Sequence, residues 1–347
     1  MRIREADPER DRDRVLAVLS RSLPAAAAAD RYAWLYLSNP HGRARVWLAE
    51  DAETGEPVGT SAGHPKRVWT DGAAVDVLDL SDFAFDRAYR TLGPALKLLR
   101  ATLEPMDRGD FAFSYDHVAN RAMFAVYQRM GGRDVSTRRR WVRLLKVSPQ
   151  LERRVGGGFG SRLLGQAGDL VLRARDAIGA RRGEVTVEPL AGDCGPEFDR
   201  LDADLTRASR LRVVRSAAHV RWRYLRNVTA RHEILCARRG GALVGWLAMR
   251  PRDPDVLAIV DVVATDPAAP GALLDAAAAA GHRRGASVLS ATVLRDSPVE
   301  ALFRAARFIA REEAPGVVVY APRAAPALAA ALQDPRQWWM LEGDEDV

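Results

Sequence analysis

Apolar positions along the chain follow helical spacing in some segments and strand-like alternation in others. Residues 7–23 place four apolar side chains on one side of a predicted helix: Val15, Leu16, Val18 and Leu19. Residues 195–211 show a similar pattern with Phe198, Leu201 and Leu205. After the first helix, "VWLA" and "VGTSAG" flank the turn "EDAETGEP", which predicts a β-hairpin.

The predicted order of elements is helix, helix, hairpin, strand, helix, strand, helix, and it occurs twice. The hexamer "WLYLSN" begins at Trp34, and "WRYLRN" begins 188 positions later at Trp222, with four of the six letters identical. A second hairpin, "EILCA" and "LVGWLAM", follows the second hexamer. Because self-similarity over so long a period indicates duplication, we expect two related domains. The predicted boundaries are 1–147 and 185–325, with a glycine-containing linker and helix at 148–184 and a tail at 326–347.

The length and charge fit this picture. A chain of 347 residues suits two domains, and its net charge of +7 would attract an anion such as a nucleic acid, a nucleotide or coenzyme A. The local basic cluster "STRRRWVRLLK" lacks interleaved aromatic residues, so nucleic acid is not favoured as a partner. The charged N-terminus and the weakly hydrophobic alanine runs predict a cytoplasmic protein without a membrane span. Cys194 and Cys236 predict buried side chains, not a disulfide framework or a metal site.

One segment of the first repeat carries candidate chemistry. "VDVLDLSDFAF" alternates as a strand does, and "DRAYRTLGPALKLL" turns into a helix. Gly93 lets a ligand approach the backbone, and Pro94 suits the first helical position. The free N–H groups and the dipole of this helix start predict an anion site, to which Arg90 adds a positive charge.

The run from Arg90 to Ala95 resembles the Arg/Gln-x-x-Gly-x-Gly/Ala signature of the GCN5-related N-acetyltransferases. "FAFDRAYR" is similar to the strand that precedes this signature in the family. "NRAMFAVYQRMGG" resembles a second family motif, with Asn120, Tyr127 and Gly131 in register. In a helix, the spacing of seven would put Asn120 and Tyr127 on one face. Thr91 departs from the family pattern, and Pro94 removes one N–H donor.

The resemblance implies an α/β (α+β, three-layer) fold with two similar domains, each a mixed, mostly antiparallel sheet flanked by helices. It implies acetyl-CoA or another acyl-CoA as co-substrate, no metal, and direct attack by the primary amine of a small molecule. The residues that it assigns to the cofactor are Phe83, Ala84, Phe85, Arg90, Thr91, Leu92, Gly93, Ala95 and Asn120. Tyr127 would be the general acid and Asp82 the general base, with Asp79 and His117 as weaker choices for the base.

The second repeat lacks these groups. "VDVVATDPAAPGALLDAAAAAG" contains no such signature, and Phe303 stands where the first repeat has Tyr127. Asp296 takes the place of Asn120, and Arg307 takes the place of Gly131. Because the signature is missing, the sequence predicts that the first repeat alone has the cofactor site; phenylalanine also has no proton to donate, so the second repeat is expected to be a scaffold or part of the acceptor pocket.

Two other classes of function remain open. The first is a transferase that uses aminoacyl-tRNA, similar to the Fem-type peptidyltransferases, which also have two domains of this kind. The second is a non-catalytic pair of domains that binds a ligand. The identity of the amine, the length of the acyl chain and the oligomeric state, including a homodimer, are left open by the sequence.

Overall fold

The computed structural model describes residues 1–70, 72–118, 120–147, 168–170, 172, 184–205 and 211–345. Residues 1–147 are called the first half, and residues 184–345 the second half. The first half contains β1 (Arg2–Ala6), α1 (Arg12–Ser22), α2 (Ala29–Tyr32), β2 (Arg45–Glu50), β3 (Pro57–Thr70), β4 (Ala73–Phe85), α3 (Leu92–Arg108), β5 (Ser114–His117), α4 (Arg121–Arg129) and β6 (Arg133–Leu144).

The second half repeats this order, with one strand inserted between its first two helices and a helix and a strand added at its end. It contains β7 (Val185–Pro189), α7 (Pro196–Leu205), β8 (Leu211–Val213), α8 (Ala217–Val220), β9 (Glu233–Arg239), β10 (Ala242–Asp253), β11 (Val256–Ala264), α9 (Ala269–Arg283), β12 (Val288–Leu294), α10 (Val299–Ala305), β13 (Ile309–Tyr320), α11 (Pro326–Leu332) and β14 (Trp338–Trp339). The two predicted hairpins are β2–β3 and β9–β10. The predicted repeat of elements is therefore confirmed.

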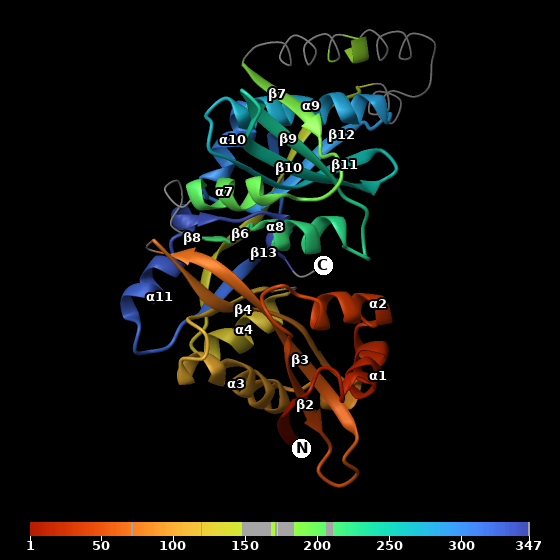
Figure 1. Cartoon of the computed structure of the whole chain (residues 1–347). Coiled ribbons are helices and arrows are strands. Elements are labelled where there is room, and N and C mark those ends of the chain that lie inside the picture. The colour runs from red at the N-terminus through yellow and green to blue at the C-terminus, as the bar shows by residue number, and fades with distance from the viewer. Residues whose placement is uncertain are drawn as a thin grey trace.

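Fourteen strands of the described residues form one sheet, in which β1 to β5 lie on one side and β12 to β7 on the other. Most pairs are antiparallel, while β4–β5, β11–β12 and β8–β14 are parallel. In the first half, α1 and α2 lie on one side of β3 and β4, and α3 and α4 on the other (Figure 1). This layered arrangement of a mixed sheet between helices confirms the predicted fold class.

The two halves exchange strands at the centre of the sheet. β13, from the end of the second half, lies between β5 and β6, and β6 lies between β13 and β12. Each half therefore completes the sheet of the other. The predicted boundaries divide the chain in sequence, but they do not divide the sheet, which contains strands from both sides of them. Most of the predicted linker at residues 148–184 lies outside the described residues, and the predicted tail contains α11 and β14.

The repeated hexamers form equivalent π-helical turns, Ala33–Leu37 and Arg221–Leu225, that meet between the halves. The Trp34 and Trp222 rings stack with their centroids 5.2 Å apart. The indole N–H of Trp34 donates to the backbone oxygen of Trp222 at 2.9 Å, and the indole of Trp222 donates to that of Trp34 at 3.0 Å. This reciprocal contact has two-fold symmetry. It explains the repeat: the hexamer packs against its own copy.

We expect Trp222→Ala to lower the free energy of unfolding by about 3–5 kcal/mol, because it leaves a cavity, removes the stacked ring and takes the indole donor away from the backbone oxygen of Trp34. Urea unfolding measures this change. Leu225→Ala is the matched control, since Leu225 belongs to the same turn but is 38% exposed; its effect should stay within about 0.5 kcal/mol. Equal, small effects of the two substitutions would contradict the packing role of the hexamer.

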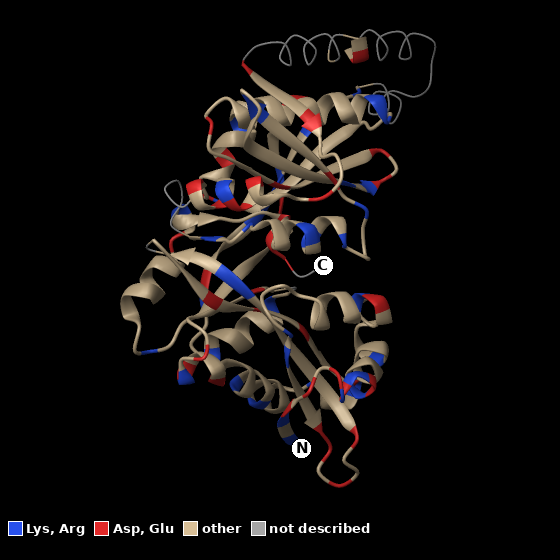
Figure 2. Cartoon of the chain, in the orientation of Figure 1, with Lys and Arg blue, Asp and Glu red and all other residues tan. Residues whose placement is uncertain are grey.

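The arginines of the basic cluster on β6 form ion pairs with the second half. They pair with acidic side chains there: Arg138 with Glu345, Arg139 with Glu300 and Glu313, Arg140 with Glu312, and Arg143 with Asp275. Elsewhere, basic and acidic residues are interspersed over both halves (Figure 2). Cys194 and Cys236 are buried and free, as predicted. Among the helices of the described ranges, none has the length and hydropathy needed to cross a membrane.

Candidate functional site

β4 and β5 separate at the place where the sequence predicts the site. They pair in parallel over three residue pairs, from Leu78–Ser114 to Leu80–Asp116. Beyond that point β4 continues to Phe85, and its register against β3 shifts between Thr60 and Ala62. Asp82 lies in this bulge with a φ of 49°, in the left-handed region that non-glycine residues seldom occupy. A bulge redirects a strand, so the end of β4 turns away from β5.

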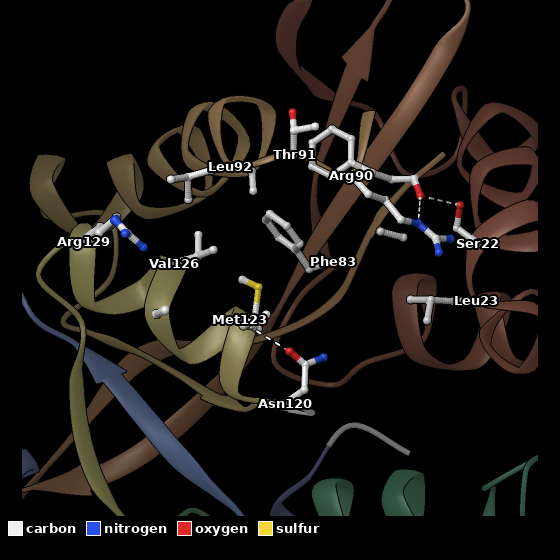
Figure 3. Close-up of a pocket in the computed structure, with 15 residues that line it drawn as sticks. Ser22, Leu23, Phe83, Arg90, Thr91, Leu92, Asn120, Met123, Val126 and Arg129 are labelled. Carbon is white, nitrogen blue, oxygen red and sulfur yellow. Dashed lines mark hydrogen bonds between the residues drawn. The ribbon is translucent and has the colours of Figure 1, made fainter. Parts of the chain in front are cut away.

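A pocket of about 560 Å³ lies between the end of β4, the start of α3, the side of α4 and the end of α1 (Figure 3). Its lining includes eight of the nine residues that the sequence assigns to the cofactor: Phe83, Ala84, Phe85, Arg90, Thr91, Leu92, Ala95 and Asn120. Gly93 is not among the lining residues. The structure thus brings these eight residues together, while their role remains a prediction.

The start of α3 opens toward solvent. Thr91 precedes the helix in an extended conformation, and no side chain of the described residues caps it. A Cβ atom added at Gly93 would meet no other atom within 4 Å. The first turn of a helix has N–H groups without an acceptor inside the helix, so the amides of Leu92 and Gly93 are available to a ligand.

The position of Pro94 differs from the prediction. α3 begins at Leu92, so Pro94 is its third residue and not its first. Proline is tolerated here because every N–H of the first turn lacks a partner in the helix. The predicted loss of one donor from this turn stands.

Two arginines border the pocket. Arg90 donates from Nε to the backbone oxygen of Phe85 at 2.8 Å, and the hydroxyl of Ser22 donates to the same oxygen at 2.9 Å. Arg129 projects from α4 at the opposite end in Figure 3. Within the described ranges, neither guanidinium pairs with a carboxylate, and no Asp or Glu lines the pocket. The pocket is therefore suited to an anionic ligand.

The two motif residues of α4 do not share a direction. Asn120 is the N-cap, outside the helix, and its side-chain oxygen accepts from the N–H of Met123 at 3.0 Å. Tyr127 is buried, and its hydroxyl donates to Oδ2 of Asp116 at 2.6 Å. Asn120 lines the pocket and Tyr127 does not. The expectation that both lie on one helix face is wrong, because a capping residue does not follow helical geometry.

Asp82 is held by neighbouring side chains. Its carboxylate accepts from Arg31 at 2.8 Å and from the hydroxyl of Tyr36 at 2.6 Å, and it does not line the pocket. Asp79, a weaker choice, bonds to Lys66 at 2.6 Å. Burial raises the pKa of Asp79 to about 7, against the opposing effect of Lys66.

His117, the other weak choice, ends β5. Neither of its buried ring nitrogens has a hydrogen-bond partner among the described residues. Burial, together with the charge of Arg138, lowers the pKa of His117 well below its usual value. A neutral imidazole at neutral pH follows from this.

The second half provides an internal comparison. Asp261 accepts from Arg215 at 2.8 Å and from Tyr224 at 2.7 Å, as Asp82 does from Arg31 and Tyr36. This Arg–Asp–Tyr trio is present in both halves, so it has a structural role in at least the half that lacks the cofactor signature.

The start of α9 differs from that of α3. The carboxylate of Asp266 lies beside it and accepts from the N–H of Ala268 at 2.8 Å. Arg239 also pairs with Asp266 and, as the largest cause, lowers the pKa of this carboxyl group. An ionised carboxylate at a helix start occupies the place that an anionic ligand would need.

Several lining residues were not predicted. Met123, Val126 and Arg129 come from α4, where their spacing of three is a helical signal that marks one face. Ser22 and Leu23 come from the end of α1, where no motif marks them. The described residues contain no group of three or more His, Cys, Asp or Glu side chains placed to hold a metal ion.

Comparisons with known proteins give matches among solved structures. No protein-family model and no curated protein sequence matches the chain. A GCN5-related N-acetyltransferase from Anabaena variabilis ATCC 29413 is 15% identical, with a TM-score of 0.65 over 92% of this chain and 72% of that chain. A probable N-acyltransferase from Enterococcus faecalis V583 is 14% identical, with a TM-score of 0.64 over 92% of this chain and 72% of that chain.

A GCN5-related N-acetyltransferase from Kribbella flavida is 18% identical, with a TM-score of 0.58 over 95% of this chain and 73% of that chain. These identities are low, and the structural agreement extends over both halves. The chain therefore has the fold of the GCN5-related N-acetyltransferases.

Proposed function

We propose that the protein is an N-acyltransferase that moves an acetyl group from acetyl-CoA to the primary amine of a small molecule. One observation carries this proposal: the uncapped start of α3 opens into a pocket that two arginines border and no described acidic side chain lines. In the second half, the carboxylate of Asp266 accepts from the N–H of Ala268, directly before α9. The proposed site is therefore in the first half alone.

The diphosphate of acetyl-CoA would bind at the start of α3. The N–H groups of Leu92 and Gly93, the helix dipole and the guanidinium of Arg90 supply donors and positive charge. The pantetheine arm would extend between the end of β4 and α4, beside Phe83 and Met123. Backbone N–H groups near Phe83–Phe85 would polarise the thioester carbonyl, and one such donor is typically worth about 3–4 kcal/mol in the transition state.

The proposed reaction is direct transfer. The amine nitrogen attacks the thioester carbon, the C–N bond forms, and the C–S bond breaks with its electron pair on sulfur. Tyr127 gives a proton to this sulfur, and a base takes the surplus proton of the amine. Asp82 is the proposed base and acts through water, because Arg31 and Tyr36 occupy its oxygens. Asp79, with a pKa near 7, is the alternative base.

A non-catalytic acyl-CoA-binding protein is the second candidate. Pro94 favours it, because the missing N–H removes one donor from the first turn of α3. Both candidates require the same pocket. Turnover distinguishes them: release of free thiol from acetyl-CoA in the presence of a panel of amines supports the enzyme, and binding without release at any amine supports the second candidate.

Gly93→Asp tests the pocket. A carboxylate at the start of α3 faces the proposed diphosphate, and like charges in contact cost several kcal/mol. We expect the affinity for acetyl-CoA, measured by titration calorimetry, to fall about 100-fold. The fold should be retained, because an added side chain meets no atom at this position and acidic residues stabilise the first turn of a helix.

Gly271→Asp is the matched control. Gly271 lies in the first turn of α9, and an added Cβ atom would also meet nothing within 4 Å. We expect this variant to bind acetyl-CoA as the unmodified protein does. If both variants bind with unchanged affinity, the start of α3 is not the diphosphate site.

A further inference from the structure

The contact between α4 and β5 joins two groups that can share a proton. Tyr127 is 2% exposed and Asp116 is 9% exposed, and the phenol donates to the carboxylate at 2.6 Å. Asp116 follows Tyr115 in β5, directly opposite Leu80 of β4. The pair therefore lies at the last paired position before β4 and β5 separate.

The second half shows what happens to this pair where the cofactor signature is absent. Ile259 lies two residues before Asp261, as Leu80 lies two residues before Asp82, and β12 places Ala291 opposite Ile259. Asp116 therefore corresponds to Ala291.

Tyr127 corresponds to Phe303 by the backbone. The N–H of Gly132 donates to the oxygen of Tyr127 at 2.8 Å, and the N–H of Phe308, also five residues on, donates to the oxygen of Phe303 at 2.9 Å. Gly131 and Arg307 both have positive φ, which extends the match. The aspartate and the tyrosine are thus lost together.

The Arg–Asp–Tyr trio behaves differently, because both halves retain it. A buried tyrosine–aspartate bond that served packing alone would have no reason to be absent from the half without the signature. An apolar pair, Ala291 and Phe303, fills the same place there with full burial. The fold accordingly tolerates the loss of both polar groups.

We propose that Asp116 is a positioning residue for Tyr127, and that the two residues deliver a proton to the leaving sulfur as one unit. This inference rests on the proposed function. A phenol has a reference pKa near 10 and a thiol one near 8.5, so a phenol alone is the weaker acid of the two. A carboxyl group that supplies a hydrogen to the phenol oxygen makes the transfer to sulfur favourable.

The protons balance as follows. In the reacting state that we propose, Asp116 is protonated and the pair holds two acidic hydrogens, one on the phenol and one on the carboxyl group; this is one proton more than in the arrangement where the phenol donates to the carboxylate. As the C–S bond breaks, the phenolic proton moves to sulfur, and the remaining hydrogen stays between the two oxygens. The product state of the pair is a phenol bonded to a carboxylate, which is the arrangement in the structure. The base releases the proton of the amine to solvent, and solvent returns one proton to the carboxyl group, so that the pair and the base are both restored.

The test uses the full chain and release of free thiol from acetyl-CoA, with water or an amine as acceptor. We expect Tyr127→Phe and Asp116→Asn each to lower kcat about 100-fold, with the KM and the calorimetric affinity for acetyl-CoA unchanged. The double variant should be no slower than Tyr127→Phe alone, because residues that act as a unit are not additive. Wild-type kcat in Asp116→Asn, or a further large loss in the double variant, would overturn the inference.

Tyr224→Phe is the control for loss of a buried phenol–carboxylate bond. It removes the bond to Asp261 in the second half, of nearly the same length, 2.7 Å. We expect lower stability and unchanged kcat. If Tyr224→Phe lowers kcat as much as Tyr127→Phe does, a general loss of stability explains both effects, and the inference is wrong. An unmodified protein that neither binds acetyl-CoA nor releases thiol refutes the proposed function itself.

Discussion

A fragment that ends at residue 147 is expected to form no folded monomer. One of the two strands that pair with β5 is β13, which the fragment lacks. Val318 and Tyr320 of β13 belong to the core under α3 and α4, and Val317 and Val319 pack on the other face. Burial of each such side chain is worth about 1.5–3 kcal/mol, so the loss is comparable to the whole stability of a domain, about 5–15 kcal/mol.

Denaturant unfolding and size-exclusion chromatography measure the outcome. The fragment should lack a cooperative transition, or associate into dimers in which each chain supplies β6 to the other. Co-expression with residues 185–347 is the control, and it should restore a folded complex that contains β13. A monomeric fragment that unfolds cooperatively and binds acetyl-CoA would show that the strand exchange is dispensable.

Acidification is expected to weaken the contact between the halves. His41 and His219 lie across it, with Nε2 of one 3.2 Å from Nδ1 of the other. Burial, with Lys66 and Arg67, lowers the pKa of His41 to about 4, and burial with His41 lowers the pKa of His219 well below its usual value. Two neutral rings can share one hydrogen, whereas two protonated rings repel each other and have no acceptor.

The sign of the effect follows from linkage. In the unfolded chain both histidines take up protons near pH 6.5, while the folded protein keeps them neutral down to about pH 4 for His41. Their contribution to stability is therefore complete above pH 6.5 and is lost as the pH falls toward 4. Each contributes at most about 1.4 kcal/mol per pH unit, so the pair contributes up to about 3 kcal/mol per unit.

The measurement compares slopes. Free energies of unfolding are determined between pH 7 and 4.5 for the unmodified protein and for the double variant His41→Gln, His219→Gln. We expect the variant to lose stability less steeply on acidification, whatever its stability at pH 7. If the free energy of unfolding falls with pH at the same slope in both proteins, the two histidines do not cause the pH dependence of stability.

Much of the fold could be predicted from the sequence, because the patterns that indicate its helices and strands are local. The apolar spacing of α1 and α7, the β-prone runs of both hairpins and the repeated hexamer each fall within a few residues. β1 and β7 were not predicted, because short strands at the edges of a sheet carry mixed, partly charged sequences such as "RIREA". The exchange of β6 and β13 was not predicted either, since strand order depends on contacts between distant segments.

The site shows the same limit. The prediction of an anion site at the start of α3 follows from Gly93 and the strand before it, and eight of the nine assigned residues line one pocket. Asp116 was not predicted as a site residue, because "SYDH" contains no motif. Its bond to Tyr127 is visible only in the structure, where β5 lies beside α4. Asn120 was given a helical direction that its capping role does not allow. The motifs therefore predicted which segments of the backbone form the pocket, but not which side chains hydrogen-bond to one another.

The exchange of β6 and β13 also bears on how such a chain arises. A single-copy ancestor with this strand order would have needed a second molecule to complete its sheet, so its folding would have depended on concentration. Fusion of two copies makes that association intramolecular and independent of dilution. In such a fused chain the second copy can lack the signature of the first, but it cannot be removed while the first requires its last strand.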